Sequence, residues 1–178
     1  YFGLVSFLDD NIGSILRALQ ETGLADNTRI VYSSDHGDNL GARGLWGKSN
    51  LYRESVDIPM IAAGPGFEHA RCDTPVSLLD LSVTLLDCFG LDAAKVLPDA
   101  TGQSLHSIAR RPFDADRFVF SEYHAVGSNS AGFMLRNGRW KYHHYVRHQP
   151  ELFDLSNDPA ATTNLATRAD HRDMLDKM

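Results

Sequence analysis

Apolar residues near the start of the chain recur every three or four positions, which is the spacing of one helix face. These residues are Leu4, Val5, Leu8, Ile12, Ile15, Leu16 and Leu19, and Gly23 follows them. A glycine just past the last periodic position is a typical helix end. Asp9 and Asp10 fall mostly outside this face. Because adjacent helical side chains diverge by about 100°, we interpret them as solvated residues rather than as metal ligands.

Two short apolar runs further along have the pattern of buried strands, and a helix pattern follows the second. The runs are residues 29–34 and residues 58–63, "IPMIAA". Continuous β-branched runs of this length are typical of strands that are buried on both faces. Ser77, with Asp80 three positions later, forms a capping-box signature, and Gly90 can end that helix. The order helix, strand, glycine-rich loop, strand, helix predicts an α/β fold with a largely parallel sheet.

The pattern changes after residue 111 to short strand-like runs. These are residues 117–123, 132–136 and 139–146, and Asn137-Gly138 between the last two favours a hairpin. We therefore predict an α/β part over residues 1–111. Residues 112–178 are predicted to form a small antiparallel sheet subdomain with a C-terminal helix.

The stretch between the two buried runs carries the clearest candidate chemistry. Asp35 and His36 directly follow the first predicted strand, and ligands of open α/β sheets bind beyond the carboxyl ends of strands. A carboxylate and an imidazole can coordinate one metal ion, and Gly37 would let the backbone turn away from that ion. A glycine-rich loop then leads to Lys48, 13 positions after Asp35, whose ammonium can neutralise an oxyanion. "DHG" alone favours an ordinary surface turn, but the loop and the lysine together favour a metal and anion site.

Composition and charge narrow the range of partners. The chain has 178 residues, 43% of them hydrophobic, which is enough for one globular unit with a smaller appendage. A net charge of -6 gives no basic footprint for nucleic acid or an anionic membrane. No apolar run approaches the ~20 residues that cross a bilayer.

Cys72 and Cys88 lack the spacing of zinc ligands. The chain opens on Tyr1 inside a helical pattern, which suggests that it begins within a longer protein. The sequence therefore does not decide whether a signal peptide precedes it.

Four blocks of the sequence, in their order, resemble a known family. They are "LVSFLDDNIGSILRAL", "SSDHGDNLGARGLWGKSNLYRESVDIPMI", "VSLLDLSVTLLDCFG" and "RNGRWKY...PELFDLSNDP". Together they resemble the C-terminal half of the sulfatase family, within the alkaline phosphatase superfamily. The resemblance is greatest to the branch of choline sulfatases and phosphonate monoester hydrolases, where an Asp-His pair supplies metal ligands. It implies an alkaline phosphatase-like sheet with flanking helices, of which residues 1–111 form the C-terminal part.

The resemblance also implies roles for individual residues. Asp35 and His36 would be metal ligands, and Lys48 would be the catalytic and substrate-binding residue that contacts the transferred group. The implied cofactor is a divalent cation, Ca²⁺ first, with Mn²⁺ or Zn²⁺ as alternatives. Neither cysteine lies in the Cys-x-Pro/Ala-x-Arg motif of the family, so the formylglycine nucleophile is expected upstream. The complete enzyme would hydrolyse small sulfate esters, and this chain alone would be inactive.

Two rival functions remain open at this point. A phosphonate monoester or phosphodiester hydrolase of the same superfamily can use the same aspartate, histidine and lysine. A non-catalytic remnant could serve as a binding or assembly module, although it would have no physical need for all three residues. The sequence does not decide whether the protein forms a homo-oligomer. It also does not decide between a cytoplasmic and a periplasmic location.

Three further expectations concern other parts of the chain. Arg53 and Asp57 exchange the signs that the family mostly has at these positions, which predicts an ion pair with its charges reversed. Trp46 is expected to anchor its loop against the core, with stacking on a substrate as the alternative. Alternation puts His143 and His144 on opposite faces of a strand, which argues against a shared metal and favours surface and cross-strand roles.

Overall fold

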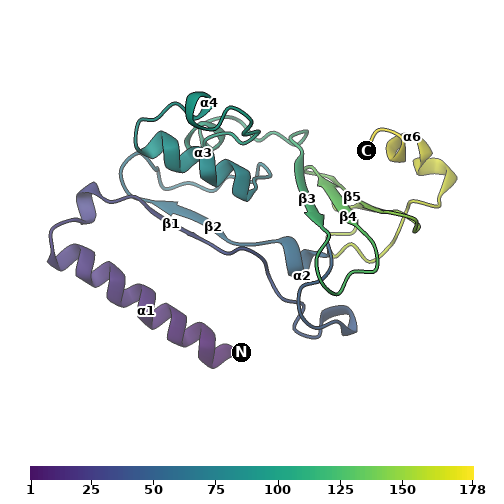
Figure 1. The fold of residues 1–178 in the computed structure, drawn as a ribbon, viewed down its shortest axis with the longest axis horizontal. Coiled ribbons are helices and arrows are strands. Elements are labelled where there is room, and N and C mark those ends of the chain that lie inside the picture. The colour runs from purple at the N-terminus through teal and green to yellow at the C-terminus, as the bar shows by residue number, and fades with distance from the viewer. The chain divides into compact units, whose positions relative to one another are not determined.

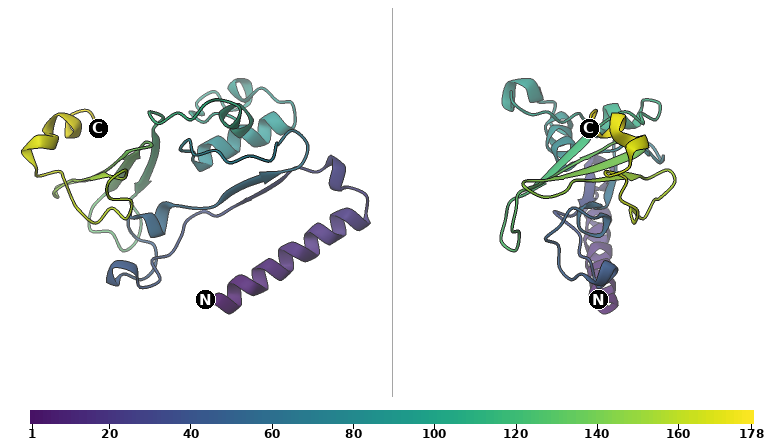
Figure 2. Two further views of the ribbon diagram at one scale, coloured as in Figure 1. Left: turned by 180° about the vertical axis from the view of Figure 1, so that it is seen from behind. Right: turned by 90° about the vertical axis from the view of Figure 1, so that its right-hand side faces the viewer.

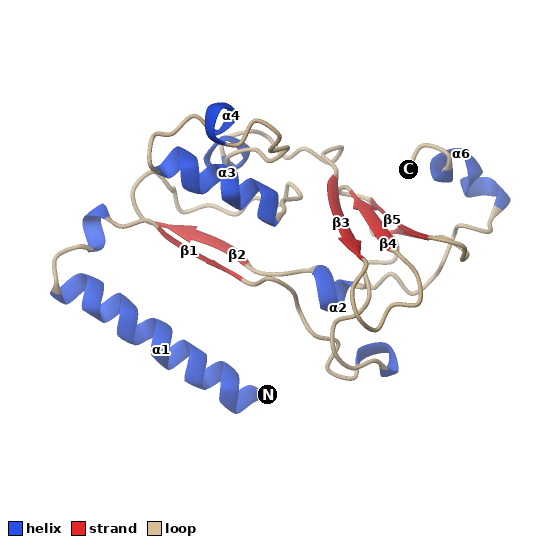
Figure 3. Ribbon diagram, viewed as in Figure 1, coloured by secondary structure: helices blue, strands red, loops and turns tan.

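The computed structural model describes residues 1–178, and Figures 1 and 3 show the course of the chain. Its α-helices are Phe2–Glu21 (α1), Arg53–Val56 (α2), Leu78–Cys88 (α3), Ala93–Val96 (α4), Leu105–Ala109 (α5) and Arg172–Leu175 (α6). Its strands are Ile30–Ser33 (β1), Met60–Ala63 (β2), Val119–Tyr123 (β3), Gly132–Arg136 (β4), Trp140–Tyr145 (β5) and Glu151–Asp154 (β6). The chain divides into two compact units, residues 1–33 with 60–69, and residues 34–59 with 70–178. These units do not test the predicted boundary at residue 111, which stays a prediction.

The first unit contains α1 and the pair β1–β2. The predicted first helix is confirmed, and the left view of Figure 2 shows it as one continuous helix. No residue of α1 is buried, and its apolar side chains are largely exposed. None of the helices in the structure combines the length and the apolar character that a membrane span needs.

The pairing of β1 and β2 corrects the predicted parallel sheet. The strands are antiparallel, with Ile30 opposite Ala63 and Ser33 opposite Met60. Parallel neighbours need a crossover connection, which is usually a helix of several turns. The connection between these strands is a long loop whose only α-helix is the four-residue α2. The prediction was wrong because the two apolar runs alone carry no information about strand direction.

The second unit contains an antiparallel sheet in the order β3-β4-β5-β6. The predicted β4–β5 hairpin is confirmed, and the Oδ1 of Asn137 accepts hydrogen bonds from the backbone N–H groups of Arg139 and Trp140. Gly138 does not have a positive φ angle. Glycine is favoured at this position because the backbone of Ala115 comes close. A Cβ at position 138 would lie 3.0 Å from the Cα of Ala115.

Alternation along β5 separates two faces of this sheet, as predicted. His143 is fully buried and its Nδ1 lies 2.9 Å from the Oε2 of Glu151, its register partner on β6. His144 lies on the opposite face and is exposed. The predicted cross-strand role of His143 is confirmed, whereas the predicted surface position is wrong for this residue. The hydroxyl of Tyr52 donates to the Oε1 of Glu151 at 2.8 Å, which attaches the segment after the glycine-rich loop to the sheet.

The predicted capping box at the start of α3 is confirmed and has a wider role. The Oδ2 of Asp80 accepts a hydrogen bond from the Ser77 N–H at 2.8 Å. Its Oδ1 accepts from the Gln103 N–H at 2.8 Å and lies 2.6 Å from the Nη2 of Arg117. Asp80 is fully buried. One carboxylate therefore joins α3 to the segment before α5 and to the chain entering β3.

Replacing Asp80 with Ala is expected to lower the free energy of unfolding by about 3–5 kcal/mol, because it leaves the Arg117 guanidinium without its buried counter-charge. Asp92→Ala is a suitable comparison. Asp92 caps α4 through the Ala94 N–H, but its side chain is 54% exposed, so that loss should be about 1 kcal/mol. Chemical denaturation of both variants measures the difference, and equal losses would contradict the central role of Asp80.

The buried Lys141 predicts a pH-dependent contribution to stability. Its side chain is 2% exposed. Burial lowers its pKa from the ordinary 10.5 to about 8. Between these pH values the unfolded chain binds a proton here that the folded chain lacks, so stability rises with pH in this window. Relative to Lys141→Met, the wild-type protein should gain up to ~3 kcal/mol between pH 7 and 10.5. Denaturation of both proteins at several pH values checks this, and a constant difference would refute it.

Candidate functional site

The loop that carries Asp35 and His36 is held against the end of α2. The Gly37 N–H donates to the Ser55 carbonyl at 2.8 Å. A Cβ at Gly37 would lie 2.1 Å from the Glu54 carbonyl oxygen. Glycine is therefore required here for close backbone approach and not for a left-handed turn, since its φ angle is not positive. This reason differs from the expected one, which was a sharp turn away from a metal ion.

The imidazole of His36 is oriented by the backbone that follows it. Its Nδ1 lies 2.9 Å from the Gly37 carbonyl oxygen, so this nitrogen carries the proton and donates it. The lone pair is then on Nε2, which lies 3.3 Å from the Oδ2 of Asp35. The His36 N–H donates to the Oδ1 of Asp35 at 2.9 Å. This hydrogen bond is the largest influence that holds the pKa of Asp35 below its ordinary value.

Lys48 reaches the same point from the other end of the glycine-rich loop. Its Nζ lies 2.5 Å from the Nε2 of His36 and donates to that lone pair. The structure thus brings together all three site residues that the sequence predicted. A carboxylate, an imidazole and an ammonium meet at one exposed edge.

Contacts on both sides of Lys48 tether it. Before it, the Asn39 side chain is 2% exposed, and its N–H and Nδ2 both donate to the Gly47 carbonyl, at 2.8 and 2.6 Å. After it, the Ser49 Oγ is hydrogen-bonded to the Tyr123 hydroxyl at 3.0 Å. Leu51 is buried at 2% exposure. The sequence pattern did not identify Asn39 or Tyr123, because their partners lie 8 and 74 positions away.

Trp46 does not anchor the loop as predicted. Its side chain is 78% exposed and its ring lies over the position that a Cβ on Gly41 would take. Asn39 and Leu51 provide the buried contacts that were expected of the tryptophan. The prediction failed because residue type alone favours burial of an aromatic, whereas the loop turns this side chain outward.

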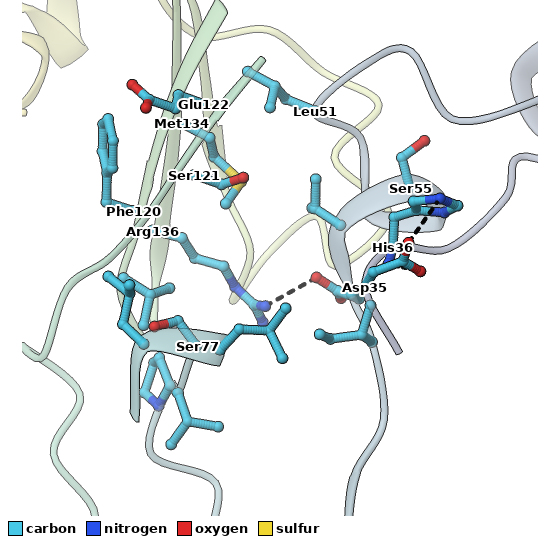
Figure 4. Close-up of a pocket in the computed structure, with 18 of the residues that line it drawn as sticks. Asp35, His36, Leu51, Ser55, Ser77, Phe120, Ser121, Glu122, Met134 and Arg136 are labelled. Carbon is cyan, nitrogen blue, oxygen red and sulfur yellow. Dashed lines mark hydrogen bonds and ion pairs between the residues drawn. The ribbon is translucent and has the colours of Figure 1, made fainter. Parts of the chain in front are cut away.

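Asp35, His36 and Lys48 line a pocket of about 610 Å³. Figure 4 shows Asp35 and His36 on one side of it and Ser121, Met134 and Arg136 on the other. The latter three come from β3 and β4, so the antiparallel sheet forms one wall.

Asp57 also lines the pocket and carries two ion pairs. Its Oδ2 lies 3.4 Å from the Nε of Arg53, which confirms the predicted pair with its charges reversed. Its Oδ1 lies 3.1 Å from the Nη1 of Arg136. Arg136 could not be identified from the sequence, since only the fold brings β4 to this loop.

The donor set fits two neighbouring ligands of a divalent cation. The Oδ2 of Asp35 and the Nε2 of His36 are adjacent, and the second carries its lone pair. Within residues 1–178, no group of three or more His, Cys, Asp or Glu side chains could hold a metal ion. Because protein metal sites usually take four to eight ligands, these two would form part of a larger set.

Comparisons with known proteins agree on one family. The family model described as Sulfatase matches residues 1–91. The choline-sulfatase of Rhizobium meliloti (strain 1021) is 39% identical over 166 residues, which is 93% of this chain and 32% of that protein. The chain spans about a third of the length of the curated relatives that it matches.

Two solved structures extend the comparison to the fold. The phosphonate monoester hydrolase of Silicibacter pomeroyi superposes with a TM-score of 0.85 at 28% identity, over 99% of this chain and 38% of that one. A second protein, solved with its substrate D-glucosamine-2-N,6-O-disulfate, has a TM-score of 0.81 at 27% identity, over 97% of this chain and 37% of that one.

These matches confirm the predicted fold class, an α/β chain of the alkaline phosphatase type with an antiparallel sheet. The family model covers more than half of the chain, and the choline-sulfatase aligns with nearly all of it. The chain therefore belongs to the sulfatase family, within the alkaline phosphatase superfamily.

Proposed function

We propose that this chain supplies the metal- and anion-binding edge of an enzyme that hydrolyses small sulfate esters. The observation that carries the proposal is the convergence of the Asp35 carboxylate, the His36 Nε2 and the Lys48 ammonium on one pocket edge. Membership of the sulfatase family supports sulfuric ester hydrolysis as the reaction.

Each of the three residues has a chemical role in this proposal. Asp35 and His36 would hold a divalent cation, with Ca²⁺ as the first candidate and Mn²⁺ or Zn²⁺ as alternatives. When bound, such an ion polarises ester oxygens and lowers the pKa of a nucleophile. Lys48 binds the sulfate oxygens and offsets the negative charge that gathers on them in the transition state.

The His36 lone pair links these roles. It can accept a hydrogen bond from Lys48 or coordinate a cation, but it cannot do both at once. The Lys48 ammonium is exposed. It is therefore free to turn from the imidazole to the oxygens of a bound anion. The hydrogen bond from His36 to the Gly37 carbonyl keeps Nε2 as the coordinating atom in either arrangement.

The nucleophile and the remaining metal ligands would come from residues outside these 178. The proposed nucleophile is a formylglycine made from a cysteine in the family motif. Cys72 is followed by "DTPV" and Cys88 by "FGLD", so neither fits that motif. Residues 1–178 alone are accordingly expected to have negligible hydrolytic activity.

A phosphonate monoester hydrolase is the second candidate. A phosphonate monoester hydrolase is among the structural neighbours, and a tetrahedral phosphonate presents similar oxygens to the same cation and lysine. The third possibility, a non-catalytic remnant, is less well supported because the three functional groups are all present and meet at one point.

In the full-length enzyme, Lys48→Ala is expected to lower kcat about 100-fold, with a smaller effect on KM, because the ammonium acts on charge that develops in the transition state. Steady-state kinetics with a panel of sulfate and phosphonate monoesters measures both constants. Lys95→Ala is the matched control, since that side chain is 83% exposed and pairs only with Asp92 nearby. An unchanged kcat in Lys48→Ala would refute the assigned role.

His36→Ala is expected to weaken the binding of the catalytic divalent cation by at least tenfold. Isothermal titration of the metal-depleted full-length protein with Ca²⁺ and with Mn²⁺ measures this without relying on turnover. His148→Ala is a control, because this histidine lies outside the pocket lining. Equal affinity in wild-type protein and His36→Ala would exclude His36 as a ligand.

A further inference from the structure

Arg43 occupies an unusual place in the loop that ends at Lys48. Its backbone is in the left-handed region at φ 55°, which is uncommon for a residue other than glycine. A side chain in this conformation persists where surrounding contacts determine it. The guanidinium of Arg43 has such contacts, and its side chain is 21% exposed.

The Arg43 guanidinium is engaged on every side. Its Nη1 donates to the Ala161 carbonyl at 3.0 Å, and its Nη2 donates to the Ala160 carbonyl. Its Nε lies 3.3 Å from the Oε2 of Glu54 in α2. Its flat face covers the Tyr52 ring, with 4.5 Å from Cζ to the ring centroid.

The two carbonyls that receive Arg43 belong to a well-defined turn near the C-terminus. The Oδ2 of Asp158 accepts hydrogen bonds from the backbone N–H groups of Thr162 and Thr163, both at 2.7 Å. Ala161 is left-handed at φ 49° and is 2% exposed. These features aim the carbonyls of Ala160 and Ala161 at the loop.

We propose that Arg43 is a positioning residue for Lys48, and that the Asp158–Thr163 turn acts on the site through it. Arg43 and Lys48 belong to the same loop, and Asn39 closes that loop on the Gly47 carbonyl directly before Lys48. A loop fixed at Arg43 and closed at Gly47 presents Lys48 at one place. The role in turnover rests on the proposed function, whereas the ordering of the loop does not.

Lysine cannot replace arginine in this role. Two hydrogen bonds to carbonyls, one ion pair and one contact with an aromatic ring use the planar fork and the flat face of the guanidinium. A lysine ammonium keeps the charge but lacks that fork and face. Arg43→Lys thus separates the charge of the residue from its geometry.

Hydrogen exchange of the full-length protein tests the loop directly. In Arg43→Lys, the Asn39, Gly41 and Leu45 amides, which are hydrogen-bonded within the loop, should exchange at least about tenfold faster. The amides of the β4–β5 hairpin should be unchanged. Asp158→Ala should reproduce the effect from the other end of the contact. Arg168→Lys is the matched control, since this arginine is 57% exposed and pairs with Asp170.

A double-mutant cycle then tests whether Arg43 acts through Lys48. Arg43→Lys alone should lower kcat about tenfold with a smaller change in KM. In the Lys48→Ala background it should have no further effect on kcat, because the side chain that it positions is absent. Additive losses would mean that Arg43 does not act through Lys48, and unchanged loop exchange would overturn its positioning role altogether.

Hydrogen exchange and kinetics together distinguish a failure of the proposed function of Lys48 from a failure of the positioning role of Arg43. If Lys48→Ala leaves kcat unchanged but the loop still loosens in Arg43→Lys, the assigned function of Lys48 fails while the ordering role of Arg43 stands. If Lys48→Ala is impaired and Arg43→Lys is fully active with an ordered loop, only the inference about Arg43 fails.

Discussion

The site depends on a buried hydrogen-bonded group that joins its segment to the antiparallel sheet. Tyr52 and Tyr145 donate to the Glu151 carboxylate at 2.8 and 3.2 Å, and His143 approaches it at 2.9 Å. Burial raises the pKa of Tyr52 to about 12, so its hydroxyl remains a donor across the physiological range. Unpaired, any of these groups would be costly to bury, whereas their convergence on one carboxylate favours a single arrangement. Tyr52 follows Lys48 by four residues, so this arrangement also fixes where the glycine-rich loop ends.

Tyr52 makes contacts with both its hydroxyl and its ring. The hydroxyl faces the sheet, while the ring face carries the Arg43 guanidinium. Tyr52 therefore connects β6 to the loop directly, and it connects β6 to the C-terminal turn through Arg43. Contacts of this kind can give Lys48, which is itself exposed, a defined position without burying it. The fixed contacts are made by residues beside the candidate site, while Asp35 and Lys48 themselves stay exposed.

Local signals in the sequence predicted much of this architecture. The periodic face of α1, the Ser77–Asp80 capping box, the β4–β5 hairpin and the reversed Arg53–Asp57 pair all involve residues close together in the chain, and all are present. Asp35, His36 and Lys48 were recognised because strand-end position and residue chemistry agree, and the structure brings them together.

What the sequence could not predict rests on contacts between distant segments. The antiparallel direction of β1 and β2, the burial of His143 and the exposure of Trp46 all depend on where other segments pack. The carbonyl partners of Arg43 lie 117 and 118 positions away, so no local pattern could identify its role.

The contact at Gly37 has a consequence for how this protein can change over evolutionary time. The Asp35–His36 pair is spaced from α2 by main-chain atoms alone, since no side chain stands between Gly37 and the Glu54 carbonyl. A substitution elsewhere does not insert atoms into this contact, whereas any side chain at position 37 would. The placement of the pair is thus insulated from drift elsewhere, provided that position 37 itself never varies.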